Sequence, residues 1–170
     1  MSSADPTPKK STESPPPPLP IPRLLVDADA LVAGAFSTSG ASHLILRLGE
    51  LSILECVAPV QVREEAERNL RYKLPEALGT FHRLVEQVIR IVPDPPAEIV
   101  ARFAGQAHPE DVSILTSAVL NECQYLLTFN TRHYFPTKDA PLVVLTPAKF
   151  MQRLRQAISR LTQAESGEQA

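Results

Sequence analysis

The amino-acid sequence predicts an α/β fold, a three-layer α/β/α sandwich around a short central parallel sheet. Short runs of strand-forming residues alternate along the chain with longer segments that carry apolar residues at helical spacing. The short runs are apolar throughout, as expected for parallel strands that helices cover on both faces. With 170 residues, the chain is long enough for one domain with a substantial core and too short for two.

The predicted elements follow one another from Arg23 onward. We expect strands at Leu24–Asp27, Ser52–Val57, Val88–Val92, Tyr125–Thr128 and Leu142–Leu145. We expect helices at Ala30–Phe36, Ser42–Gly49, Pro59–Arg71, Pro75–Glu86, Ala97–Ala104, Pro109–Asn121 and Ala148–Leu161. Pro59 suits the first turn of its helix because proline has no N–H to leave unpaired there.

The chain divides into three regions by composition. Residues 1–22 hold eight of the 17 prolines, so we expect a disordered tail, and its composition also fits a ligand for a proline-recognising domain. Residues 23–162 are expected to form the folded domain. Residues 163–170 are polar and are expected to form a flexible C-terminal tail.

Composition and charge argue against several classes of protein. With 17 Lys+Arg against 19 Asp+Glu, the bulk charge does not indicate tight nonspecific DNA binding. Cys56 and Cys123 stand far apart, without the spacing of a zinc or redox site. No apolar run reaches the roughly 20 residues of a membrane span. We therefore expect a cytoplasmic protein with no membrane contact.

Two acids, Asp27 and Asp29, follow the first predicted strand directly. The carboxyl end of a parallel strand is where α/β proteins bind ligands. Carboxylates beside a core are costly unless they are hydrogen-bonded or bind a metal ion. Asp27 is also explained by a strand-end acid that accepts backbone hydrogen bonds, and Asp29 by a helix cap. The pair nevertheless marks the beginning of a candidate acidic site.

The helix predicted at Pro59–Arg71 places Glu65 toward the protein. Its apolar stripe consists of Val62, Ala66 and Leu70. Glu65 lies on or beside this stripe, and Asn69, one turn later, is placed to orient it. Other glutamates of the helix lie on the opposite side, four residues before arginines with which they form solvated ion pairs: Glu64 before Arg68, and Glu67 before Arg71.

Later in the chain, the same reasoning selects Asp111, Thr128 and Asn130. Asp111 is aligned with the apolar stripe of the helix predicted at Pro109–Asn121, whereas Glu110 lies further round. Both acids also complement the positive end of the helix dipole. Thr128 and Asn130 follow the fourth strand at the same sheet edge, although Thr-Phe-Asn is also a common turn sequence.

Several carboxylates at one sheet edge raise one another's pKa unless a cation neutralises them. Oxygen ligands without histidine or cysteine suit Mg²⁺ or Mn²⁺ better than zinc. Such ions promote phosphodiester hydrolysis by activating water and stabilising the developing charge.

From Leu24 to about Phe150, the order of these motifs resembles the PIN domain, a family of Mg²⁺/Mn²⁺-dependent ribonucleases. The motifs are Asp27-Ala28-Asp29, Glu65, Pro109-Glu110-Asp111, Thr128-Phe129-Asn130 and Leu145-Thr146-Pro147. The sequence departs from the family at Asn130, where aspartate is frequent, and at His133, where another acid often occurs. A neutral amide still holds a water molecule or a metal ion, but it lowers the negative charge of the site.

The resemblance implies an endoribonuclease, either the toxin of a toxin–antitoxin pair or an RNA-processing enzyme. Asp27, Glu65 and Asp111 would hold the metal, and Asn130 and Asp29 would complete the site or orient water. Thr128 would form a hydrogen bond with one of the acids. A metal-activated water would attack phosphorus and leave 5′-phosphate and 3′-hydroxyl ends.

The family resemblance also implies an RNA substrate, an antitoxin or other protein partner, and a homodimer. Arg68, Arg71 and Lys73, near the end of the Glu65 helix, are candidates for contact with the RNA backbone, although a solvated helix face explains them equally well.

Two alternatives remain open. Asp27-Ala28-Asp29 also resembles the nucleophile motif of haloacid-dehalogenase-type phosphatases, with Thr128 as a phosphate-binding hydroxyl, but such enzymes need a second acidic pair late in the chain. The second alternative is a PIN-like module that binds RNA or protein without cleaving, which the amide at Asn130 favours.

Overall fold

The computed structural model describes residues 21–138 and 140–167, and within the last helix it describes the side chains of residues 147–160 and 163. The chain folds into five parallel strands in the order β3-β2-β1-β4-β5. The strands are β1 (Arg23–Val26), β2 (Glu55–Pro59), β3 (Ile89–Val92), β4 (Tyr125–Leu127) and β5 (Val143–Leu145). The predicted α/β class and parallel sheet are confirmed. The predicted tail over residues 1–22 lies outside the described residues except for its last two.

Seven α-helices connect and cover the strands. They are α1 (Ala28–Phe36), α2 (Ala41–Glu50), α3 (Val60–Lys73), α4 (Leu78–Gln87), α5 (Ala97–Val100), α6 (Val112–Leu120) and α7 (Pro147–Gly167). Short 3-10 turns occur at Pro75–Ala77, Ala101–Phe103 and Thr131–His133.

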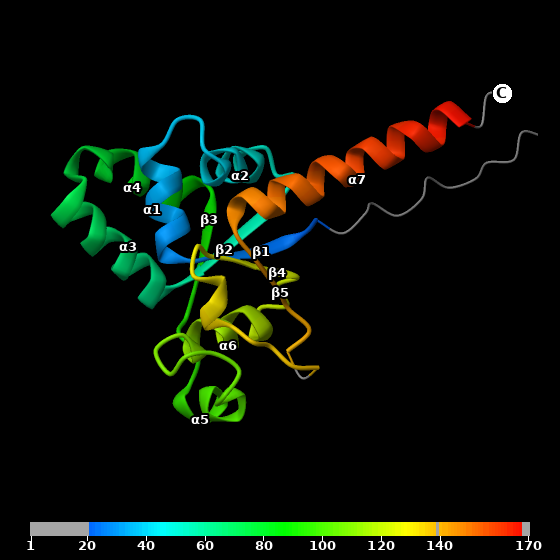
Figure 1. Ribbon diagram of the computed structural model, residues 1–170. Coiled ribbons are helices and arrows are strands. Elements are labelled where there is room, and N and C mark those ends of the chain that lie inside the picture. Colours follow the sequence, from blue (N-terminus) through cyan, green and yellow to red (C-terminus); the bar gives the residue numbers. More distant parts are fainter. Residues whose placement is uncertain (1–20, 139, 168–170) are drawn as a thin grey trace, which may run out of the picture.

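The helices form two layers, one on each side of the sheet (Figure 1). Helix α1 packs against α2, α3 and α4, and α7 packs against α2, so these helices make one layer. Helix α6 packs on β4 from the other side, with α5 beside it. The three-layer α/β/α sandwich predicted from the sequence is therefore confirmed.

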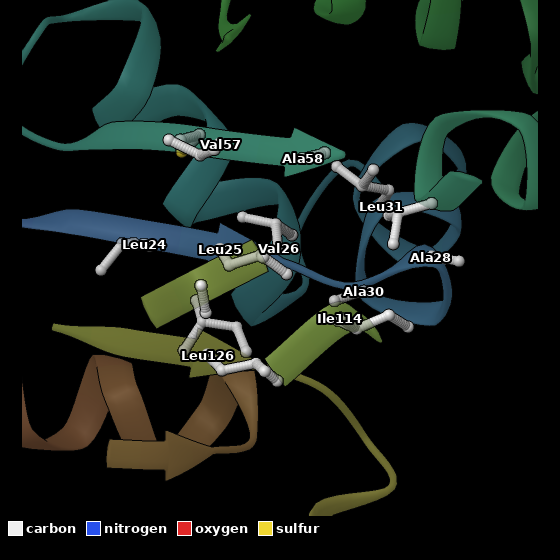
Figure 2. Close-up of a cluster of buried hydrophobic side chains, with 14 of the residues drawn as sticks. Leu24, Leu25, Val26, Ala28, Ala30, Leu31, Val57, Ala58, Ile114 and Leu126 are labelled. Carbon is white, nitrogen blue, oxygen red and sulfur yellow. The ribbon is translucent and has the colours of Figure 1, made fainter. Parts of the chain in front are cut away.

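The central strand β1 is covered on both faces. Leu24, Leu25 and Val26 are all buried, and Figure 2 shows them among side chains of α1, β2, β4 and α6. A strand buried on both sides reads as a continuous apolar run, which is why the sequence predicted it clearly. Burial of this strand fixes the position of the residue that follows it, Asp27.

Several boundaries differ from the prediction. Pro59 ends β2 and precedes α3, because its fixed φ fits an extended residue at a strand end as well as a first helical turn. The helix predicted at Pro109–Asn121 begins only at Val112, so Asp111 immediately precedes it. Helix α7 continues to Gly167, past Leu161, and thus overlaps the first part of the tail expected at residues 163–170.

Among the described helices, none combines the length and the apolar character that crossing a membrane requires.

Candidate functional site

The site lies at the carboxyl edge of the sheet, between β1 and β4. The chain runs outward from β1 through β2 to β3 and then returns to the other side of β1 as β4. The connection that follows β1 leads to one side of the sheet, and the connection that follows β4 leads to the other. Where the connections of two adjacent strands diverge in this way, a crevice opens at their carboxyl ends, and α/β proteins bind ligands there. Asp27 follows β1 and Thr128 follows β4. The backbone N–H of Asp27 donates to the Leu127 carbonyl over 2.9 Å, which aligns the two strand ends.

Asp27 is buried at this edge of the sheet, only 7% exposed. Its Oδ1 accepts a hydrogen bond from the Ala28 N–H at 2.8 Å, so Asp27 is the N-cap residue of α1. Its Oδ2 accepts from the Tyr134 hydroxyl at 3.3 Å. Burial, followed by the neighbouring charge of Asp29, raises the pKa of Asp27 to about 6. The charged form of Asp27 is therefore destabilised without a cation.

Asp29 is not the helix cap that the sequence suggested, because Asp27 occupies that position. Asp29 lies in the first turn of α1, and its side chain reaches across to the segment after β4. Its Oδ2 accepts from the Phe129 N–H at 2.9 Å and lies 3.4 Å from both Thr128 Oγ1 and Asn130 Nδ2. Its Oδ1 is buried and has no hydrogen-bond partner.

Asp111 enters the site from the segment that precedes α6. Its Oδ2 lies 2.8 Å from Nδ1 of His133, a contact that the sequence analysis did not predict. The negative charge of Asp111 contributes to the raised pKa of Asp29, so the two carboxylates act on each other. The predicted placement of Asp111 beside the strand-end acids is thus seen in the structure.

Glu65 is exposed on α3 rather than turned into the protein. Neither Glu65 nor Asn69 makes a side-chain hydrogen bond among the described residues, so the orienting contact that we expected between them is absent. Without such a partner, the Glu65 carboxylate stays in water. Its charge nevertheless contributes to the raised pKa of Asp27, which places it at the rim of the same site.

Thr128 and Asn130 both organise the crevice. Thr128 is fully buried, and its hydroxyl accepts from the Asn130 N–H at 3.1 Å. Asn130 is exposed, and its amide faces Asp29. The Thr-Phe-Asn segment therefore forms a turn whose donors face the Asp29 carboxylate.

Tyr134 is the site residue that the sequence analysis missed. It is buried, and burial together with the charge of Asp27 raises its pKa, so the phenol stays protonated as a donor. The contact joins residues 107 positions apart. No periodicity in the Thr131–Tyr134 segment signals such a contact, which is set only by the folded topology.

Burial raises the pKa of Asp27 and Asp29, and the charges of Glu65 and Asp111 add to this effect, but the four acids do not surround a single point closely. Among the described residues, no three acids of this site place ligand atoms within 4.8 Å of one another. Without a cation, these negatively charged side chains repel one another. The carboxylate of Glu65 is exposed, so it has room to move toward the other acids. The group that does meet this distance lies beside the site and consists of His108, Glu110 and His133.

The basic residues predicted to contact RNA are all exposed on α3. Arg71 pairs with Glu67 at 2.7 Å, as its spacing predicted. Arg68 and Lys73 have no ion pair among the described residues, and Glu64 pairs with Arg63 at 3.5 Å instead of Arg68. This surface leaves Arg68 and Lys73 available to a negatively charged ligand.

No protein-family model matches the sequence, and none of the curated proteins matches it either. Solved structures do match. PAE2754 from Pyrobaculum aerophilum aligns with a TM-score of 0.57 over 80% of this chain and 97% of its own, at 20% identity. VapBC2 from Rickettsia felis, solved bound to a DNA fragment from their promoter, aligns at 0.56 over 73% and 98%, at 12% identity. FitAcB from Neisseria gonorrhoeae aligns at 0.51 over 73% and 97%, at 16% identity.

These similarities confirm the fold that the motif resemblance implied, and the chain has a PIN-like α/β fold. The aligned regions cover nearly the whole length of each neighbour. Since the identities are 20% or less, these similarities concern the fold, and an activity has to follow from the residues of the site itself.

Proposed function

We propose that this chain is a metal-dependent endoribonuclease whose acidic crevice binds Mg²⁺ or Mn²⁺. The observation that carries the proposal is the buried, unpartnered Oδ1 of Asp29 beside a second buried carboxylate, Asp27. A buried carboxylate oxygen without a donor is costly, and a hard cation would supply both the partner that Asp29 Oδ1 lacks and a countercharge for Asp27. The residues present therefore fit such an ion.

Asp27, Asp29 and Asp111 would hold the ion directly or through water, with Glu65 approaching from the rim. When bound, the ion supplies activation of water and stabilisation of the charge that develops on the phosphate. The Tyr134 hydroxyl and the Phe129 N–H hold the carboxylates in position. Arg68 and Lys73 would attract the RNA backbone.

Asp29 also compensates for the negative charge that Asn130 does not supply. The family pattern has an acid where Asn130 stands, but here the carboxylate of Asp29 lies 3.4 Å from the Asn130 amide. Asp29 and Asn130 together place one carboxylate and one amide beside the carboxyl end of β4. We infer that Asp29 supplies the charge that Asn130 does not, which favours an active nuclease over a PIN-like module that only binds.

The proposal is tested by RNA cleavage with and without metal. We expect the purified chain to cleave end-labelled single-stranded RNA in Mn²⁺ or Mg²⁺, to stop in EDTA and to recover when the metal is restored. The products should carry 5′-phosphate and 3′-hydroxyl ends. Cleavage that persists in EDTA would contradict the proposal, and metal binding with no cleavage of varied RNAs would favour the binding module.

Asn130→Asp is expected to change metal-free stability and metal response in opposite directions. The new carboxylate replaces a donor with a charge that repels Asp29 Oδ2, so the melting temperature in EDTA should fall by about 2–4 °C. The added ligand charge should enlarge the rise in melting temperature that Mn²⁺ produces. Thermal denaturation in EDTA and in Mn²⁺ measures both effects.

Asn121→Asp is the matched control for this variant. Asn121 donates through its amide to the Ser117 carbonyl at 2.8 Å, on α6 and away from the acids. The same chemical change there should lower the melting temperature without altering its response to Mn²⁺. Equal metal responses in the two variants would show that Asn130 does not border the metal position.

A protein partner is part of the proposal. VapBC2 from Rickettsia felis was solved bound to a DNA fragment from their promoter. We propose that this chain is the toxin of a toxin–antitoxin pair in the cytoplasm. We also propose that the chain forms a homodimer. The phosphatase alternative has less support, because such enzymes need a second acidic pair late in the chain, and after Asn130 the only acids are Asp139 and two glutamates near the C-terminus.

A further inference from the structure

We propose that His108, Glu110 and His133 form a separate site for a transition-metal ion of the Zn²⁺ class. Each residue offers one ligand atom, and these atoms lie within 4.8 Å of one another. This is the group among the described residues that reaches such proximity, and it has two imidazoles and one carboxylate. That ligand set suits zinc, cobalt or nickel, whereas Mg²⁺ prefers oxygen ligands alone.

The backbone holds the two histidines in fixed relation. The His108 N–H donates to the His133 carbonyl at 2.8 Å, and Ala107 and Tyr134 form an antiparallel bridge next to them. These contacts join the segment before α6 to the segment after β4. Because the main chains are tied together, binding requires only side-chain rotation and not a rearrangement of the loops.

The side chain of His133 is already oriented as a ligand. Its Nδ1 lies 2.8 Å from Asp111 Oδ2, so the carboxylate engages this nitrogen and leaves Nε2 as the nitrogen available to a metal ion. A carboxylate behind a ligating histidine is the arrangement that fixes ring orientation and increases basicity in zinc sites. Asp111 thus supports His133 from behind while it faces the acidic crevice.

The other two ligands are mobile enough to close the site. His108 and Glu110 are exposed, and the His108 ring stacks on His133 with centroids 4.3 Å apart and planes 5° from parallel. Zinc–nitrogen bonds of about 2.0–2.1 Å in a tetrahedral site require ligand atoms about 3.3 Å apart. Because His108 and Glu110 are exposed, rotation of their side chains would bring ligand atoms that already lie within 4.8 Å of one another to this spacing.

This site does not depend on the proposed nuclease activity. It uses none of the carboxylate oxygens of Asp27, Asp29 or Glu65, and it is filled by a different class of metal. It shares only Asp111, as a hydrogen-bond partner of His133. A metal ion on His133 would strengthen the Nδ1–H donor and so hold Asp111 more firmly in its present position.

Calorimetric titration of the full chain with Zn²⁺, in excess Mg²⁺ to occupy the carboxylate crevice, tests the proposal. We expect one Zn²⁺ per chain and a loss of affinity of about tenfold or more in His108→Gln and in His133→Gln. Co²⁺ should give the visible absorption of a nitrogen-ligated ion, and the same variants should remove it. Both readouts are made without RNA, so failure of the nuclease proposal leaves them interpretable.

His82→Gln is the matched control. His82 is also an exposed histidine beside a carboxylate, with Nε2 3.3 Å from Glu67 Oε1, but it has no second histidine next to it. Zinc affinity should be unchanged in His82→Gln and in Asp27→Asn. Absence of saturable zinc binding would overturn the proposal, and so would binding that Asp27→Asn removes and His108→Gln does not.

Discussion

Replacing Asp27 by asparagine is expected to abolish metal-dependent RNA cleavage while making the metal-free protein more stable. The charged carboxylate is buried beside Asp29, and its pKa of about 6 shows that ionisation is disfavoured there. Asparagine removes that charge, so the free energy of unfolding in EDTA should rise at neutral pH. Loss of a ligand worth several kcal/mol in the transition state should reduce the cleavage rate by about 10³-fold.

The same variant should lose the rise in melting temperature that Mn²⁺ gives the unaltered chain, because binding to the folded state alone produces that rise. Single-turnover cleavage and thermal denaturation measure the two effects. Glu64→Gln is the control, since Glu64 is an exposed acid on α3 whose partner is Arg63. It should change neither property. Cleavage by Asp27→Asn at the rate of the unaltered chain would place the chemistry elsewhere.

Without metal, the contribution of Asp27 to stability is expected to fall as the pH rises from about 4 to above 6. The pKa of Asp27 is about 6 in the folded chain against 3.8 for an unperturbed aspartate, so the folded state binds the proton more tightly than the unfolded state. Stability is therefore greatest where Asp27 is protonated, and it is lost as pH rises through the folded pKa. The difference corresponds to about 3 kcal/mol at most.

Urea denaturation in EDTA across this pH range, compared between the unaltered chain and Asp27→Asn, isolates this contribution. Other acids act in the opposite sense, since arginine partners lower the pKa of Glu50 and Glu55, and they are common to both proteins. Saturating Mn²⁺ should reverse the trend, because the cation favours the ionised form. Parallel pH profiles for the two proteins would contradict the assignment of a raised pKa to Asp27.

The sequence predicted those parts of the fold that local patterns determine. β1 was clear because Leu24, Leu25 and Val26 form an unbroken apolar run that is buried on both faces. The strand end placed Asp27 correctly at this edge, whereas Asp111 reaches it from the segment before α6 and not from the helix stripe on which it was predicted. The bounds of β2 were less clear, since Pro59 is compatible with both a strand end and a helix start.

Contacts between distant segments could not be read from the sequence. Asp27, and not Asp29, caps α1. The side chain of Asp29 instead accepts hydrogen bonds from Phe129 and Thr128, a hundred residues away along the chain. Tyr134 and His133 carry no periodic signal in their short segment. Glu65 was expected to face inward from helical spacing alone, but a stripe position does not supply the hydrogen-bond partner that burial of a carboxylate requires.

The sheet order has a consequence for synthesis of the chain. Asp27, Asp29, Glu65 and Asp111 all precede β4 in sequence, yet β4 and the segment after it supply the donors that hold the first two in place. A ribosome that has made only the first 120 residues has therefore made every acid of the site without its supporting frame. If the proposed nuclease activity is correct, the nascent chain would acquire it only after β4 and the segment that follows have been made and have packed against β1.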